Sequence, residues 1–96
     1  MATYISLVSF TDHGIRNIKE SPSRAEAARA LAAKVGVTIK SLYYTIGSHD
    51  LVVTLEGSDE AVTTFLLKTG SLGNIKTSTM RAYTSDEMAK IIGNMP

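Results

Sequence analysis

Apolar residues recur along this chain with two different periods, and the segments that alternate predict strands. Residues 3–11 read Thr-Tyr-Ile-Ser-Leu-Val-Ser-Phe-Thr, a run rich in β-branched and aromatic residues that is typical of a strand. Residues 37–46 and 51–56 predict two further strands, because the four turn-forming residues Gly47-Ser48-His49-Asp50 between them are typical of a hairpin. A fourth strand is predicted over residues 74–83.

Three segments combine a helical period with the capping residues of helices. Ser21 and Pro22 open the first, because serine is a good N-cap and proline fits the first turn, and Gly36 is placed to end it. Ser58 caps a second helix. Residues 84–87 read Thr-Ser-Asp-Glu, a capping box that opens a short last helix. The apolar residues of this last helix are expected to face the core: Met88, Ile91, Ile92 and Met95.

The order of these elements is β-α-β-β-α-β-α, with residues 12–20 expected to form a polar loop. Short connections and right-handed crossovers favour one α+β architecture for this order, the ferredoxin-like β-α-β-β-α-β sandwich with a short C-terminal helix. Its four antiparallel strands take the order 4-1-3-2, and two helices cover one face. No linker, repeat or low-complexity tract interrupts the chain, so residues 1–96 are expected to form a single domain.

Both faces of the predicted sheet carry large apolar side chains, although two helices can cover only one face. Alternation puts Ile5 and Leu7 on the opposite side of the first strand from Val8. An uncovered apolar face of that size is an association site, so we expect a homodimer of the dimeric α+β barrel type, or a higher oligomer of dimers. The face expected to form the interface carries Val8, Leu42 and Tyr44.

Composition and charge narrow the classes of function. The 44% hydrophobic and 20% charged residues are ordinary for a globular protein. The absence of cysteine excludes disulfides, thiol catalysis and cysteine-based metal sites. A net charge of +1 gives little electrostatic support for binding nucleic acid or an anionic membrane, so neither is expected as a partner. The chain shows no signal peptide or long apolar run, so we expect a cytoplasmic protein.

The predicted topology brings polar residues from distant parts of the chain to one edge of the sheet. The end of the first strand, the hairpin and the start of the fourth strand share this edge, which we call the rim. The first helix also begins at the rim, so its free backbone N–H groups place the positive end of the helix dipole there. The candidate ligand-binding residues of the rim and of the adjoining barrel side are Asp12, His13, Arg16, Tyr44, His49, Asp50 and Asn74.

Several chemistries are open at the rim. Asp50 can orient His49 in an acid–base dyad, whereas the position of Asp50 in a tight turn favours hydrogen bonds to turn amides. His13 and His49, with two neighbouring aspartates, offer metal-ligating groups, but no short ligand spacing supports a metal site and no metal or cofactor is predicted. Tyr43 and Tyr44 are adjacent in the second strand, so one ring points to the helices and the other to the interior of the expected barrel. The ring on the barrel side is expected to line a pocket for a small apolar or aromatic ligand, together with Tyr4, Ser6, Lys40 and Thr54.

Five stretches spread over nearly the whole chain resemble the sequence of one protein family. They are residues 2–12, Gly14-Ile-Arg-Asn17, the pair Pro22 and Arg24, Gly36-Val-Thr-Ile-Lys-Ser41, and Leu72-Gly-Asn74. Together they resemble the GYD domain family of small bacterial proteins, which is named for a Gly-Tyr-Asp signature in the hairpin. In this chain His49 stands where that tyrosine is expected. The resemblance implies a ferredoxin-like fold of the dimeric α+β barrel type and implies no particular activity.

The leading hypothesis is a small cytoplasmic homo-oligomeric protein of unknown biochemical function that binds a small organic ligand in the barrel or at the rim. The alternative is an enzyme, either a cofactor-independent isomerase or a monooxygenase-like enzyme of the same barrel fold, and it rests on fold analogy alone. A ligand-binding regulatory module has the same order of elements, although such modules are usually attached to another domain. A ring with a polar tip at His49 would suit the mouth of a pocket.

Overall fold

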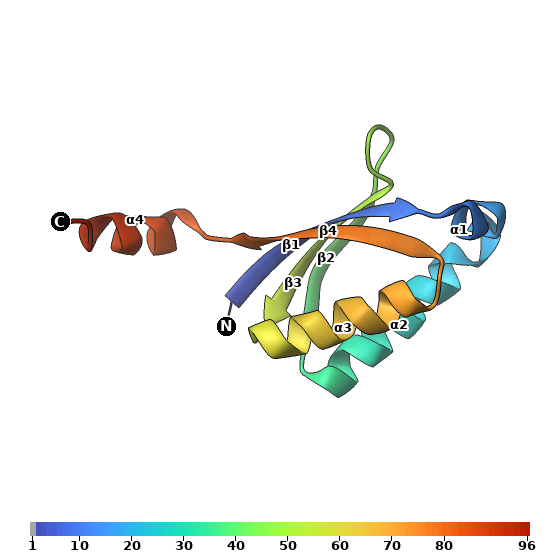
Figure 1. Ribbon diagram of the computed structural model, residues 1–96, viewed down its shortest axis with the longest axis horizontal. Coiled ribbons are helices and arrows are strands. Elements are labelled where there is room, and N and C mark those ends of the chain that lie inside the picture. Colours follow the sequence, from blue (N-terminus) through green and yellow to red (C-terminus); the bar gives the residue numbers. More distant parts are fainter. Residues whose placement is uncertain (1) are drawn as a thin grey trace.

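A four-stranded antiparallel sheet forms the centre of the computed structural model, which describes residues 2–96 (Figure 1). The strands lie in the order β2-β3-β1-β4, which confirms the predicted order and the ferredoxin-like α+β class. Because β1 pairs antiparallel with both β3 and β4, it lies in the interior of the sheet. The strands are β1 (Ala2–Phe10), β2 (Thr38–Tyr44), β3 (Leu51–Gly57) and β4 (Ile75–Ala82).

Two long helices, α2 (Ser21–Val35) and α3 (Asp59–Ser71), cover one face of the sheet (Figure 1). Gly36 ends α2 in the left-handed conformation with a φ of 86°, as its position predicts. The N-cap of α2 differs from the prediction by one residue. Glu20 is the N-cap and Ser21 is the first helical residue, and the Ser21 hydroxyl is hydrogen-bonded to the Tyr44 hydroxyl at 2.8 Å.

The expected loop over residues 12–20 is instead helical. It forms α1 (Asp12–Arg16) and the 3₁₀ helix η1 (Ile18–Glu20). The hydroxyl of Thr11 caps α1 by accepting from the Gly14 amide at 3.1 Å. A helix of five residues is too short to show a helical period, so the pattern could not reveal it.

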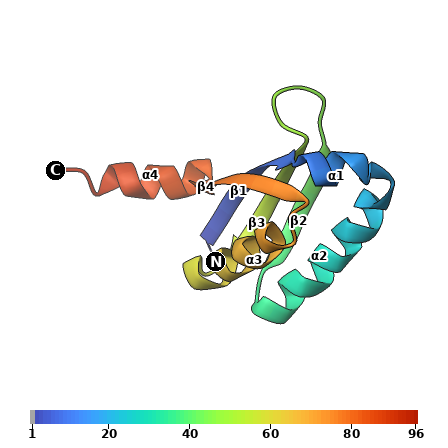
Figure 2. The ribbon, with the colours of Figure 1, turned by 45° about the vertical axis from the view of Figure 1, so that its right-hand side comes forward.

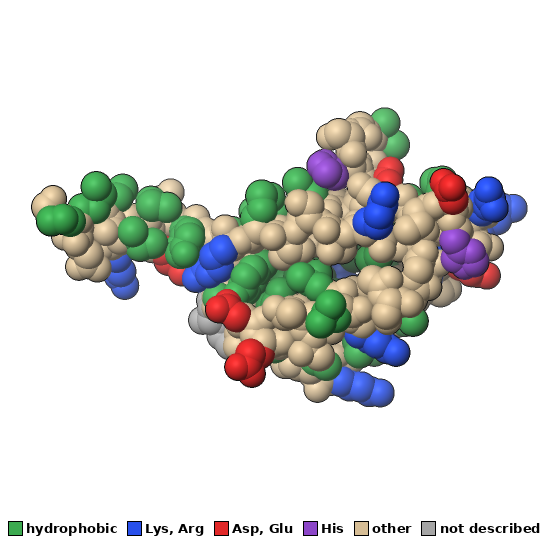
Figure 3. Space-filling model, viewed as in Figure 1, with side chains coloured by type: hydrophobic (Ala, Val, Ile, Leu, Met, Phe, Trp, Pro, Cys, Tyr) green, Lys and Arg blue, Asp and Glu red, His purple; other side chains and the backbone are tan. Residues whose placement is uncertain are grey.

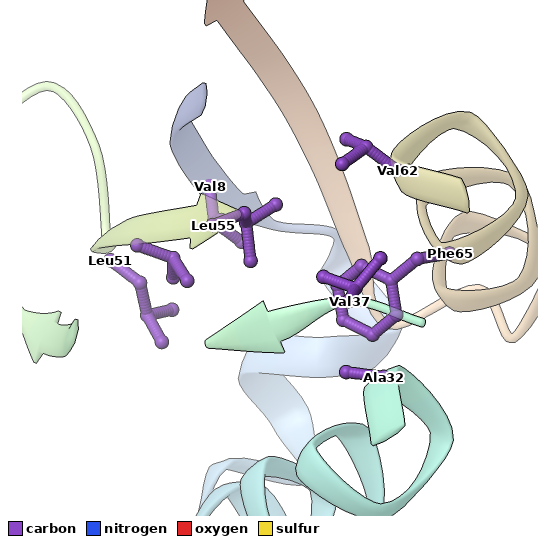
Figure 4. Close-up of a cluster of buried hydrophobic side chains, with 8 residues drawn as sticks. Val8, Ala32, Val37, Leu51, Leu55, Val62 and Phe65 are labelled. Atoms are coloured by element: carbon purple, nitrogen blue, oxygen red, sulfur yellow. The ribbon is translucent and has the colours of Figure 1, made fainter. Parts of the chain in front are cut away.

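The hydrophobic core lies between the sheet and the two long helices (Figure 4). Leu55 and Val62 are the largest fully buried side chains, and Phe65 of α3 is 5% exposed. This core contains Val8, which is also 5% exposed. The further buried hydrophobic residues of the core are Ala32, Val37, Leu51 and Val53, and Leu42 is among the partly buried residues packed against it.

The expected interface face was therefore assigned to the wrong side of the sheet. Val8 and Leu42 pack in the core, and the Tyr44 hydroxyl bonds to α2, so these residues face the helices. Alternation along a strand separates the two faces but does not say which face the helices cover. The face without helices, which we call the open face, carries Ile5, Leu7, Tyr43, Val52 and Met80.

The last helix, α4 (Ser85–Gly93), projects away from the sheet and from both long helices (Figures 1 and 2). The prediction that its apolar residues face the core of the same chain is wrong. The capping box that opens it is present as predicted, because Thr84 and Glu87 exchange backbone and side-chain hydrogen bonds. Two residues separate β4 from α4, and the helix continues away from the sheet beyond the end of β4 (Figures 1 and 2).

Candidate functional site: the rim and the cavity beneath it

The end of β1 is joined to the hairpin and to the start of β4, so the rim forms as the topology predicts. On one side, the Phe10 amide donates to the Asp50 carboxylate at 2.8 Å, and the Asp50 amide donates to the carbonyl oxygen of Val8 at 2.8 Å. On the other side, the Thr11 amide donates to the Asn74 carbonyl oxygen at 3.0 Å. Residues separated by about forty and sixty positions in the sequence thus meet at one edge.

Asp50 does not orient His49 in this structure. Its carboxylate extends the β1–β3 pairing by accepting from the Phe10 amide, which belongs to β1 and not to the hairpin turn that the sequence indicates. His49 accepts from the Thr45 hydroxyl through its backbone oxygen at 2.6 Å. Within residues 2–96, the Nδ1 atom of His49 is buried without a hydrogen-bond partner. The two side chains therefore do not form an acid–base dyad.

The side chains of Asp12, His13 and Arg16 all lie exposed on the short helix α1. Arg24 of α2 holds this region in place, since its guanidinium donates to the carbonyl oxygens of Asn17 and Gly14 at 3.0 and 3.3 Å. Among residues 2–96 there is no group of three or more His, Cys, Asp or Glu side chains arranged to hold a metal ion. The structure thus places these candidates at the rim without assembling them into one site.

A cavity of about 100 Å³ lies beneath the rim, between the sheet and the two long helices. Its walls are largely apolar and include Leu42, Val53 and Phe65. Tyr44 and Ser21 line it as a hydroxyl pair, with an oxygen–oxygen distance of 2.8 Å. The predicted pocket residue Tyr44 thus does line a pocket, but on the helix side of the sheet and not on the open face.

The other residues expected beside Tyr44 separate into three groups. Ser6 lines the cavity, and its hydroxyl pairs with that of Thr79 at 2.9 Å. Tyr4 instead contacts the Arg81 guanidinium, 5.7 Å from its ring centre. Lys40 forms an ion pair with Glu56 at 3.7 Å, and Thr54 is cross-strand to Ile5 on the open face.

Sequence reasoning missed Ser21, Thr69 and Phe65 as parts of the cavity. The sequence indicates only a helix cap at Ser21. Its role in the cavity follows from its burial, which the structure shows. A serine at the start of a helix that is only 6% exposed needs a partner for its hydroxyl, and the pocket side of Tyr44 supplies it.

Comparison with known proteins bears on the identity of the chain. A model of the GYD domain family matches residues 4–92, nearly the whole chain. The chain belongs to the GYD domain family. The match confirms the resemblance found in the sequence.

One solved structure shares the fold of this GYD domain. It is described as the crystal structure of FFRP-DM1, is 26% identical in sequence, and is similar over 86% of this chain and all of that chain, with a TM-score of 0.58. A comparison with curated proteins gives no match. Among residues 2–96, none of the helices has the length and apolar character needed to cross a membrane.

Proposed function

We propose that this GYD domain is a homo-oligomeric protein that binds a small, mainly apolar organic molecule in the cavity between its sheet and helices. The observation that carries the proposal is the cavity itself. Well-packed cores contain few voids larger than a water molecule, so an apolar cavity of about 100 Å³ is a candidate ligand site. An apolar cavity of about 150 Å³ holds benzene, so this one, at about 100 Å³, suits a small side group or a ring that extends from it toward the rim.

The hydroxyl pair of Ser21 and Tyr44 supplies the polar part of the site. Two hydroxyls that share one hydrogen bond retain one O–H hydrogen and several lone pairs for a third group. Tyr44 is 50% exposed, so this end of the cavity can be reached from solvent at the rim. We therefore expect a ligand with an apolar ring or short chain and one hydroxyl or carbonyl group.

Binding is tested with phenol and benzene, which differ by a single hydroxyl, by following backbone amide shifts in NMR titrations. We expect shifts at the cavity walls for both compounds and tighter binding of phenol. Ala28→Leu fills the cavity from α2 and should abolish binding, whereas Ala30→Leu, on the exposed side of the same helix, should leave it unchanged. Shifts confined to the protein surface, or equal binding by the two variants, would rule out the cavity as the site.

The open face supports the homo-oligomeric part of the proposal. Leu7 is cross-strand to Val52, and Val52 is in turn cross-strand to Tyr43, so an apolar row crosses three strands. Ile5 is cross-strand to Met80 in the next row. Tyr43 is 67% exposed and Met80 is 47% exposed. An antiparallel sheet that is covered on one side is expected to be polar on its other side. The open face is apolar instead, which favours its packing against a second sheet.

Light scattering on the purified protein tests the association. We expect a mass above that of one chain at micromolar concentration, and dissociation by Met80→Asp. Leu67→Asp is the matched control, because Leu67 is also exposed, at 69%, but lies on α3 away from the open face. A wild-type protein that is monomeric and folded would contradict the oligomer without affecting the cavity.

A further inference from the structure

We infer that α4 is an arm that packs on a second copy of this chain. The inference deepens the proposed self-association by adding a contact that the open face does not include. The apolar stripe of the arm consists of Met88, Ile91, Ile92 and Met95, which are 41%, 44%, 56% and 67% exposed. Figure 3 shows hydrophobic side chains along this projecting helix.

The stripe has the form of a docking surface and not of scattered apolar residues. Met88, Ile91 and Ile92 follow the i, i+3, i+4 spacing of one helix face, and Met95 lies two residues beyond the end of α4. The charged residues Asp86 and Lys90 lie on the opposite side of the helix at 100° per residue. Because isolated helices shorter than about 12–15 residues are marginal in water, a helix of nine residues needs its apolar side covered.

The chain does not cover this stripe with its own sheet, because α4 projects away from the sheet (Figures 1 and 2). Tyr83 and Thr84 are the only residues between β4 and α4, and two extended residues span at most about 7 Å. The junction is also held in place. The Arg81 guanidinium lies 4.3 Å from the centre of the Tyr83 ring, and the Thr84 amide donates to the Glu87 carboxylate at 2.8 Å.

The single chain exposes more surface than a compact monomer of its mass, and the excess is large enough for an interface. Its accessible surface is 6379 Å², whereas a compact monomer of this mass exposes about 5,350 Å². The excess of about 1,000 Å² is close to the roughly 800 Å² that each partner buries in a standard interface. The radius of gyration is 14.7 Å, against about 12.5 Å for a compact domain of this length.

A second copy is the occupant that these observations favour. It carries an uncovered apolar face of its own, and a symmetric pair would cover both arms at once. A membrane surface is less suitable, because helices that lie on membranes are rich in Lys and Arg on their polar side. The polar side of α4 instead has the acidic Asp86 and Glu87 beside the single Lys90.

The arm is tested by isotope-filtered NMR on an equal mixture of Ile-methyl-labelled and unlabelled chains, after mixing under dissociating conditions. We expect contacts between the methyl groups of Ile91 and Ile92 and protons of the other copy. In parallel, Ile92→Lys should weaken association at least tenfold by light scattering. Ala89→Lys, which places the same charge outside the stripe of the same helix, should change association less than twofold.

Two of the outcomes separate the arm from the open-face interface of the proposed function. An oligomer in which Ile91 and Ile92 show no contact with another copy overturns the arm and leaves the open-face interface intact. Dissociation by Ile92→Lys but not by Met80→Asp supports the arm and overturns the open-face interface. A monomeric wild-type chain overturns both the arm and the open-face interface. If that monomer binds anionic phosphatidylserine vesicles through α4, the arm docks on a membrane and not on a second copy, and the inference is also overturned.

Discussion

Gly14 is the residue where the smallest change should disturb the rim most. It is buried in α1 against the start of β4, and its φ is not positive, so glycine is required there for space and not for backbone freedom. A Cβ atom at this position would lie 1.9 Å from the carbonyl oxygen of Asn74 and 2.9 Å from its carbonyl carbon. Both atoms belong to backbone, so Gly14→Ala must push α1 away from β4.

The size of the effect follows from the contacts that this shift breaks. Overpacking a tight site costs about 1–3 kcal/mol. The carbonyl oxygen of Asn74 also accepts from the Thr11 amide, and the Thr11 hydroxyl donates to the carbonyl oxygen of Gly73 at 2.6 Å. Weakening these two bonds adds about 0.5–1.5 kcal/mol each. We therefore expect Gly14→Ala to lower the free energy of unfolding by about 2–6 kcal/mol.

Urea unfolding followed by far-ultraviolet circular dichroism measures this loss, at one fixed protein concentration because association also contributes to stability. With a slope of about 1.5 kcal/mol per molar urea, a loss of 3 kcal/mol lowers the midpoint by about 2 M. Gly70→Ala is the control, since a Cβ there meets nothing within 4 Å in helix α3. It should stabilise the protein by up to about 1 kcal/mol. An unchanged midpoint for Gly14→Ala would refute the close-contact argument.

Three further predictions concern the rim, the cavity and the arm. Asp50→Ala should lower the free energy of unfolding by about 1–3 kcal/mol in the same urea assay, because the Phe10 amide loses its acceptor, and Asp50→Asn should lower it less. A double-mutant cycle of Ser21→Ala and Tyr44→Phe should give a coupling of about 0.5–1.5 kcal/mol, and no coupling would mean that the hydroxyl pair is not formed in solution. Hydrogen bonds from the Thr84 amide lower the pKa of the Glu87 carboxyl, so the charged form is favoured in the folded arm. Stability from Glu87 is therefore present above its unfolded pKa and lost as the pH falls through the lowered value. NMR should show fraying of α4 in acid, and Glu87→Gln should remove that pH dependence.

Local signals in the sequence determined the strands, most helix boundaries and the order of the sheet. A helix cap or a hairpin turn is specified by a few adjacent residues, as at Gly36 and in the capping box of residues 84–87, so it can be recognised without tertiary structure. The convergence at the rim was also predictable. Once the strand order is known, Asp50 and Asn74 must reach the end of β1.

The tertiary structure alone decided which apolar groups became core. Alternation placed Val8 and Leu7 on opposite faces of β1, but only the packing of α2 and α3 buried Val8 and left Leu7 on the open face. The same holds for α4. Its apolar stripe was evident from the spacing, yet a stripe does not specify what it packs against. Only the structure shows that α4 projects away from the sheet, so that the chain does not cover the stripe with its own core.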